Sequence, residues 1–221
     1  MKAMILAAGR GDRMRPLTDK TPKPLLKVNG KPLIQYTIEN LVKAGFKEII
    51  INVAYLGVQI IEMLGKGHQF GATITYSDEG SQGLETAGGI IKALPLLGNQ
   101  PFIVINSDIA CDFPLEKLKQ QSLKLAHLIL VNNPEFHLEG DFSLAENGKL
   151  GTIESNRYTF SGIGLYHPKL FENYGNNTLK LGPILKEAAN KGDVSGEKFE
   201  GLWVDIGTPE RLQVVNDHYK S

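Results

Sequence analysis

Residues 4–13 are Met4-Ile5-Leu6-Ala7-Ala8-Gly9-Arg10-Gly11-Asp12-Arg13, a short apolar run that passes into a loop rich in glycine and arginine. The apolar run predicts a β-strand, and the loop begins at the carboxyl end of that strand. Glycines let backbone N–H groups approach phosphate oxygens, and arginine neutralises such oxygens in pairs. A dinucleotide fingerprint would need a glycine in place of Met14, and the chain has no Gly-Lys-Ser or Gly-Lys-Thr of a P-loop. The loop is therefore a different kind of polyphosphate site or only a turn.

Short apolar runs alternate with amphipathic stretches through the first half of the chain. We expect strands at residues 4–7, 49–53, 74–76 and 102–105, and helices at 32–44, 56–64 and 86–94. This alternation is typical of βα units on a largely parallel sheet.

The pattern changes after residue 122, where strand-like segments follow one another at 126–131, 142–144, 150–153 and 159–166. Helices return at 181–190 and 209–219 around a short strand at 202–205. We therefore expect added antiparallel strands in this half. No tract of proline, serine or charge divides the chain, which predicts a single domain over residues 1–221, with halves of about 1–125 and 126–221.

The composition restricts the classes of function. Hydrophobic residues make up 42% and charged residues 22%, as in a globular protein with a substantial core. The 24 Lys and Arg balance the 24 Asp and Glu, so no overall field attracts nucleic acid or an anionic membrane. The single cysteine, Cys111, excludes an internal disulfide and is expected to be buried and inert. With no signal-like or membrane-spanning run, we expect a cytoplasmic protein that binds neither nucleic acid nor membrane.

Three further charged residues stand where phosphate chemistry would need them. Lys23 lies between Pro22 and Pro24, which hold it in an extended segment soon after the loop. Asp108 and Asp205 each follow an apolar strand, and carboxylates at strand ends suit Mg²⁺. A lone Lys or Asp of this kind is more often structural, and the spacing does not show that the two carboxylates meet. The next carboxylate, Asp112, is expected to cap a helix that starts near residue 114.

The sequence resembles the sugar-phosphate nucleotidyltransferases from end to end. The resemblance is carried in order by residues 6–18, Thr21-Pro22-Lys23-Pro24-Leu25, Leu84-Glu85-Thr86-Ala87-Gly88-Gly89, Asn106-Ser107-Asp108 and Trp203-Val204-Asp205-Ile206-Gly207-Thr208-Pro209. It implies a Rossmann-like α/β core, a mostly parallel sheet with helices on both faces. It also implies that a nucleoside monophosphate passes from a nucleoside triphosphate to a sugar 1-phosphate, with Mg²⁺ as cofactor.

The site residues follow from that resemblance. Arg13 and Lys23 are the expected catalytic cations, and Asp108 and Asp205 the expected metal ligands. The nucleotide would contact Ala7, Ala8, Gly9, Gly11, Asp12, Arg13, Lys23, Gly83, Glu85 and Gly88, with the base lying against residues 80–89. The five histidines share no metal-ligand spacing, so we expect none of them at the metal.

Within the family the chain resembles most the uridylyltransferases that act on N-acetylmuramate 1-phosphate in peptidoglycan recycling. Guanylyl transfer to mannose 1-phosphate is the alternative, and a sensor that binds nucleotide sugar without turnover is an alternative of another class. We expect a monomer or weak homodimer.

The sugar is expected to contact Asn106, Asp141, Thr159, Ser161 and Gly162. Asn donates and accepts hydrogen bonds and Asp accepts them, which suits a sugar edge, although Asp141 could simply end the polar loop at 132–140. The lactyl carboxylate of a muramic acid would need a cation, for which Arg157, Lys180 and His137 are equal candidates.

Overall fold

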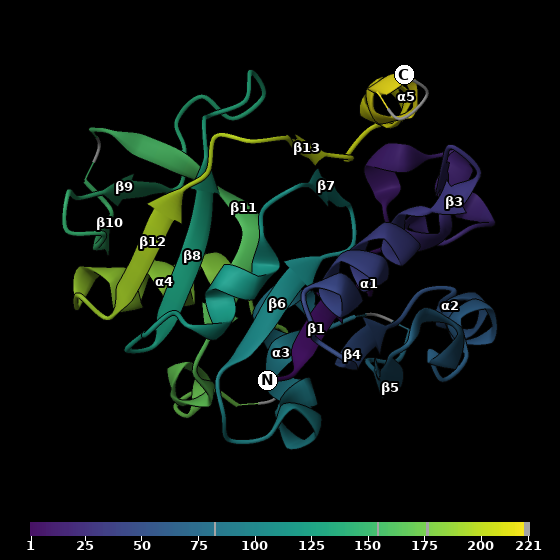
Figure 1. The fold of residues 1–221 in the computed structure, drawn as a ribbon, viewed down its shortest axis with the longest axis horizontal. Coiled ribbons are helices and arrows are strands. Elements are labelled where there is room, and N and C mark those ends of the chain that lie inside the picture. The colour runs from purple at the N-terminus through teal and green to yellow at the C-terminus, as the bar shows by residue number, and fades with distance from the viewer. Residues whose placement is uncertain (82, 154, 176, 219–221) are drawn as a thin grey trace.

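A nine-stranded mixed sheet organises the computed structural model, which describes residues 1–81, 83–153, 155–175 and 177–218 (Figure 1). The strand order is β10-β9-β11-β6-β1-β4-β5, with β8 paired to β11 and β12 paired to β8. The parallel core consists of β1 (Ala3–Leu6), β4 (Glu48–Val53), β5 (Thr73–Asp78) and β6 (Phe102–Asn106). The antiparallel additions are β9 (Phe142–Leu144), β10 (Leu150–Gly151) and β11 (Arg157–Tyr166), and β8 (Ala126–Val131) runs antiparallel to β11.

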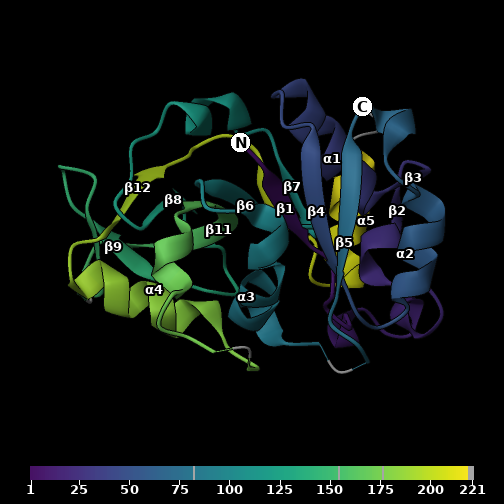
Figure 2. The same cartoon turned by 90° about the horizontal axis from the view of Figure 1, so that it is seen from below.

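Helices cover both faces of this sheet because the core strands are apolar on both sides. Ile5 and its neighbours face a cluster that contains α1 (Leu33–Lys43) and α2 (Gly57–Leu64). Met4, next in the strand, faces α3 (Glu85–Leu97) and α4 (Leu181–Asn190) on the other side (Figure 2). Burying one such side chain stabilises the fold by about 1.5–3 kcal/mol. The expected α/β class, with a parallel core and antiparallel strands in the second half, is confirmed.

One helix end differs from the prediction by more than a single residue. Helix α3 was expected to end at residue 94 but continues through Pro95 to Leu97. A proline removes a single backbone donor, and the burial of Leu97 in the core holds the last turn in place. Helix α5 (Pro209–His218) begins where expected, while Tyr219, its expected last residue, lies outside the described part of the chain.

The strand predicted at 142–144 is confirmed, while several other short strands were missed. β12 (Val194–Lys198) lies parallel to β8, but its sequence has no run of apolar residues to reveal it. β2 (Lys27–Val28) and β3 (Lys31–Pro32) form a small hairpin. The strand expected at 150–153 ends at Gly151, and Ile153 is exposed.

Asp112 is not a helix cap, contrary to the prediction. The segment after it is a short 3₁₀ helix, Leu115–Lys119, that begins after Pro114 and has no side-chain cap. Proline's fixed φ already starts that turn, and the backbone N–H of Asp112 donates to the Leu202 carbonyl at 3.2 Å.

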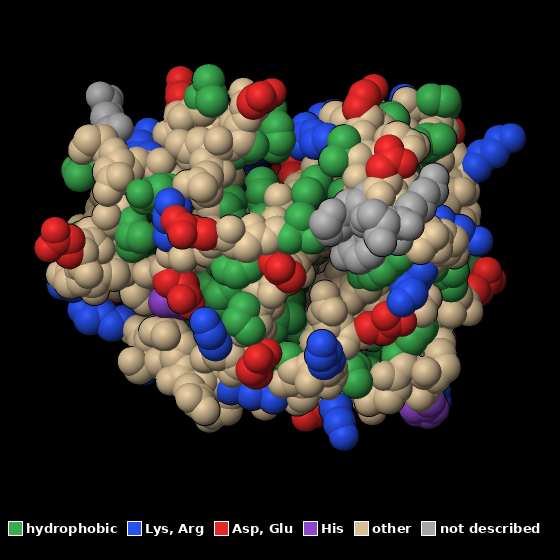
Figure 3. Space-filling model, turned by 45° about the horizontal axis from the view of Figure 1, so that its top comes forward, with side chains coloured by type: hydrophobic (Ala, Val, Ile, Leu, Met, Phe, Trp, Pro, Cys, Tyr) green, Lys and Arg blue, Asp and Glu red, His purple; other side chains and the backbone are tan. Residues whose placement is uncertain are grey.

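The C-terminal segment returns to the first half. β13 (Trp203–Asp205) pairs antiparallel with β7 (Ile109–Cys111), and α5 then packs over the β2–β3 hairpin through Val215 and Val28 (Figure 1). None of the helices in the described residues is long and apolar enough to cross a membrane. On the face drawn in Figure 3, Lys and Arg side chains are interspersed with Asp and Glu, in keeping with the formal net charge of +0.

Candidate active site

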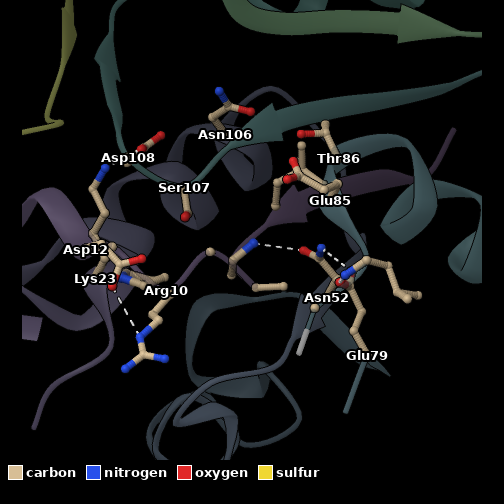
Figure 4. Close-up of a pocket in the computed structure, with 18 of the residues that line it drawn as sticks. Arg10, Asp12, Lys23, Asn52, Glu79, Glu85, Thr86, Asn106, Ser107 and Asp108 are labelled. Carbon is tan, nitrogen blue, oxygen red and sulfur yellow. Dashed lines mark hydrogen bonds and ion pairs between the residues drawn. The ribbon is translucent and has the colours of Figure 1, made fainter. Parts of the chain in front are cut away.

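A cavity of about 650 Å³ opens at the carboxyl ends of β1, β4 and β6, where parallel α/β sheets bind ligands. Figure 4 shows Lys23 and Asp108 on one side of it and Glu85 and Thr86 on the other. Most of the predicted nucleotide and catalytic residues line this cavity: Ala7, Ala8, Gly9, Gly11, Asp12, Arg13, Lys23, Gly83 and Glu85. Asn106, predicted to contact the sugar, and Asp108, predicted to bind the metal, also line it.

The loop after β1 is folded tightly around Gly11. Gly11 has φ +73°, and a Cβ there would lie 3.1 Å from side-chain atoms of both Lys23 and Thr18. The hydroxyl of Thr18 donates to the Gly11 carbonyl at 2.8 Å. A glycine is therefore required for the loop to pack against the Lys23 segment.

The cations of the loop are not equivalent. The carboxylate of Asp12 pairs with Arg10 at 3.2 Å and with Arg15 at 3.4 Å. Within the described chain Arg13 has no carboxylate partner, and it lines the cavity. Arg13 is thus the loop arginine whose guanidinium group is free to meet an anion.

Lys23 and Asp108 form an ion pair at the cavity wall (Figure 4). Lys23 is only 8% exposed, and Asp108 lies two residues after the end of β6. The carboxylate of Asp108 compensates the hydration that the lysine side chain loses on burial.

Asp205 reaches the same end of the sheet through the β13–β7 pairing. Asp205 lies opposite Ile109, and the backbone N–H of Ile206 donates to the Asp108 carbonyl at 2.8 Å. The carboxylate of Asp205 pairs with Arg211 at 2.7 Å and does not line the cavity, although Gly207 does. The two predicted metal ligands therefore lie on neighbouring backbones, each paired with a cation. The described residues contain no cluster of three or more potential metal ligands.

A buried polar network that the sequence did not reveal holds the cavity floor together. The side-chain oxygen of Asn52 accepts from the backbone N–H of Ala7 at 2.8 Å, and its amide donates to Glu79 at 2.6 Å (Figure 4). The other oxygen of Glu79 accepts from the Leu84 N–H at 2.7 Å. The network fixes the loop after β1 relative to the segment before α3.

Two glycines of α3 serve packing within the protein. A Cβ on Gly89 would lie 2.3 Å from the Glu79 carboxylate, so the glycine leaves room for the network. A Cβ on Gly88 would lie 2.4 Å from the Asn177 carbonyl. Gly88, predicted to contact nucleotide, is buried and lines neither cavity, because this close packing occupies its surface.

A second cavity of about 390 Å³ adjoins the first and shares Leu6, Glu85, Thr86 and Asn106 with it. Glu85 has φ +59°, a strained conformation for a residue with a side chain, at this junction. A Cβ on Gly162 would lie 2.5 Å from the Asn106 amide, so this glycine gives Asn106 its space. The predicted sugar residues Asn106, Asp141 and Gly162 line this cavity.

The other two predicted sugar residues, Thr159 and Ser161, do not line the second cavity. Phe160, Gly162 and Tyr166 face the cavity, and side chains alternate along a strand, so Thr159 and Ser161 point the other way. Their hydroxyls have partners there, with Thr159 donating to Asn133 at 2.9 Å and Ser161 accepting from the Ile163 N–H at 3.2 Å.

The structure also distinguishes the three candidates for the cation that a lactyl carboxylate would need. One oxygen of Asp141 accepts from the Phe160 N–H at 2.8 Å, and the other contacts His137 at 3.2 Å. Arg157 donates to the Asp141 backbone carbonyl at 3.2 Å. Of the three candidates only Lys180 lines the cavity, and it is joined there by Lys186, which the sequence did not indicate.

The cysteine has no role in this chemistry. Cys111 is half-buried in β7, and burial raises the pKa of its thiol to about 11. The group therefore stays protonated at neutral pH, as expected for an unreactive cysteine.

A strand-end cavity lined by Arg13, Lys23 and Asp108, joined to a second cavity that contains Asn106, Asp141 and Lys180, defines a class of protein that transfers phosphate-linked groups. Residues 2–221 match the nucleotidyl transferase family, and the chain belongs to that family.

The chain is also similar to individual proteins, of which two are relatives in sequence and one is a solved structure. The chain is 50% identical to the N-acetylmuramate alpha-1-phosphate uridylyltransferase of Neisseria meningitidis serogroup B, over 96% of each chain. It is 34% identical to the protein of that name from Caulobacter vibrioides, over 94% of this chain and 92% of the other. A putative glucose-1-phosphate thymidylyltransferase from Bacillus anthracis shares the fold, with a TM-score of 0.86 over 100% of this chain and 96% of that chain at 24% identity.

Proposed function

We propose that this protein transfers UMP from UTP to N-acetylmuramate 1-phosphate and releases pyrophosphate, in the cytoplasm. The junction of the two cavities carries the proposal. The first offers cations for a triphosphate, the second offers polar groups for a sugar, and Asn106 lies between them. The relationship to N-acetylmuramate 1-phosphate uridylyltransferases supports the choice of base and sugar.

The reaction joins two anions, so catalysis depends on position and charge. An oxygen of the sugar phosphate attacks the α-phosphorus of UTP, the bond from that phosphorus to the bridging oxygen breaks, and pyrophosphate leaves. The attacking oxygen is already ionised and needs no strong base. Arg13 would hold the departing phosphates, and Lys23 would stabilise charge near the α-phosphate.

Nucleotidyl transferases typically depend on a metal ion. The donor set here fits Mg²⁺, because Asp108 directly precedes β7, Asp205 ends the strand that pairs with β7, and both supply hard carboxylate oxygens. Their present partners are cations, Lys23 and Arg211, which shows that this edge attracts positive charge. Mg²⁺, when held there, would neutralise phosphate charge, while Lys23 would be free to turn toward phosphate.

The base would lie against residues 80–89. Gly83 has φ +68° and lines the first cavity, so its backbone can approach a flat ring. The Asn52–Glu79 network orders the same segment. Guanine would need further partners for its N1–H and amino group, and Glu85 is the available acceptor, so guanylyl transfer to mannose 1-phosphate is the alternative.

Pyrophosphate release, measured with each of four nucleoside triphosphates and several sugar 1-phosphates, tests the proposal. We expect UTP with N-acetylmuramate 1-phosphate to give the highest kcat/KM. A GTP preference would contradict the base assignment, and equal use of N-acetylglucosamine 1-phosphate would contradict the sugar assignment. Binding without turnover of any pair would indicate a sensor.

A further inference from the structure

One end of the second cavity is basic. Lys180 and Lys186 line it, together with Leu181 and Gly182 from the first turn of α4. The first N–H groups of a helix have no partner within the helix, and Lys180, the residue before α4, provides no side-chain cap. Two ammonium groups and the positive end of a helix thus meet at one wall.

These charges are not compensated by the carboxylates around them. Neither lysine has a carboxylate partner among the described residues, and Glu187, next to Lys186 in α4, pairs with Lys191 at 2.6 Å. Asp141 lines the same cavity, but both of its oxygens are already engaged with Phe160 and His137. Glu85, the other carboxylate that lines this cavity, lies at the junction with the first cavity, so the wall remains suited to an anion.

A buried hydroxyl provides independent support for a ligand. Tyr166 lines this cavity and is fully buried, and its hydroxyl has no hydrogen-bond partner in the described chain. A Cβ on Gly164 would lie 2.6 Å from that hydroxyl, so the glycine lets the tyrosine ring lie along β11. Buried polar groups nearly always have a partner, and an unmatched donor in a cavity wall indicates a bound acceptor.

We propose that this wall binds a carboxylate carried by the sugar, with Lys180, Lys186 and the start of α4 as the anion site and Tyr166 as a hydrogen-bond donor. The inference rests on the proposed function. With the 1-phosphate directed past Asn106 toward Lys23, the far side of the sugar enters the second cavity. N-acetylmuramate differs from N-acetylglucosamine by a lactyl ether that ends in a carboxylate, so these residues determine the choice between the two sugars.

The test combines enzyme variants with three sugar 1-phosphates: N-acetylmuramate, its neutral lactyl methyl ester and N-acetylglucosamine. Each is assayed with UTP for kcat/KM. Lys180→Ala combined with Lys186→Ala should lower kcat/KM for the acid by about 30-fold and affect both neutral sugars much less, because only the acid loses charge-assisted bonds. The single variant Lys180→Arg, which keeps the positive charge, should largely retain the wild-type kcat/KM for the acid. Lys92→Ala, an exposed lysine on α3, is the matched control.

Tyr166→Phe removes only the hydroxyl and leaves the charges in place. We expect about a 5-fold loss for the acid and little change for N-acetylglucosamine 1-phosphate, the size of one lost hydrogen bond. Thermal unfolding of each variant shows whether the fold is retained.

The possible failures are distinguishable. Equal losses for all three sugars would mean that the lysines bind the 1-phosphate, which overturns the carboxylate site while UMP transfer stands. A wild-type protein that uses ester and acid equally also overturns it. If no sugar phosphate is turned over, the proposed function fails, and calorimetric titration with N-acetylmuramate 1-phosphate and N-acetylglucosamine 1-phosphate decides the site alone. Equal affinity of the wild-type protein for the two sugar phosphates would overturn the carboxylate site. Unchanged affinity for N-acetylmuramate 1-phosphate in the double variant would overturn it as well.

Discussion

The two cavities are built in different ways. The first is made by loops at the ends of parallel strands, and its lining is nearly contiguous in sequence at residues 6–14, 83–86 and 106–108. The second is made by alternate residues of β11 and by the start of α4, which are brought together only by the fold. Apart from the four residues that the cavities share, we therefore expect transfer and the choice of sugar to depend on different residues, which can be altered independently.

The largest expected decrease in kcat comes from removing the carboxylates proposed to bind the metal. Asp108→Asn and Asp205→Asn should each lower kcat by about 1,000-fold, because each removes charge from the proposed metal site and almost no volume. Steady-state kinetics over a range of Mg²⁺ concentrations checks this, with Asp112→Asn as a control that lines neither cavity. Wild-type rates at low Mg²⁺ in both variants would show that the metal is held elsewhere.

Lys23→Ala should have the next largest effect, a decrease of about 100-fold in kcat, the size expected when a preorganised charge is removed from a transition state. The comparison is with Lys20→Ala, an exposed lysine in the same connecting segment. If KM rises while kcat is unchanged, Lys23 contributes to binding only.

In the second cavity, Asp141→Ala should raise KM for the sugar phosphate by about 10-fold and leave KM for the nucleotide nearly unchanged, since its carboxylate lies at that wall. Ser161→Ala is the matched test of strand parity, because Ser161 points away from the cavity. We expect neither KM to change with it. A rise in KM for the sugar phosphate in Ser161→Ala would show that the Ser161 side chain faces the sugar after all.

The two cavities also differ in how well their residues could be predicted from the sequence. The β1 loop, Lys23 and Asp108 could be predicted to lie together because their order along the chain is itself the signal, and all three line the first cavity. Thr159 and Ser161 do not line the second cavity, because the prediction took adjacent residues of one strand, whose side chains lie on opposite faces. Asn52 and Glu79 were missed because each looks like an ordinary polar residue, one next to last in β4 and the other just after β5, and only the fold brings them within hydrogen-bonding distance.

The smallest expected effect concerns neither cavity. His127 lies buried on β8, opposite Ser195 of β12, and burial lowers its pKa below the ordinary value of about 6.5, against the opposing effect of Glu197. Below that pH the unfolded chain takes up a proton that the folded protein resists, so the free energy of unfolding should decrease as pH falls from about 6.5. Above it, this contribution stays constant.

Urea unfolding at several pH values, compared between wild type and His127→Gln, measures that contribution. The variant should lose part of the decrease below pH ~6.5, whereas His68→Gln, at an exposed histidine, should not. An identical pH dependence in wild type and His127→Gln would contradict the assignment.

The pairing of β13 with β7 has a consequence for the protein during its synthesis. The parallel core is complete once residue 106 has been made, but Asp205 reaches Asp108 only after strand Trp203–Asp205 has been added to Ile109–Cys111. The loop after β1 and Lys23 are therefore synthesised long before the chain carries both carboxylates. On the ribosome, or after premature termination, such a chain would lack Asp205, and activity would be expected to begin only with the last part of translation.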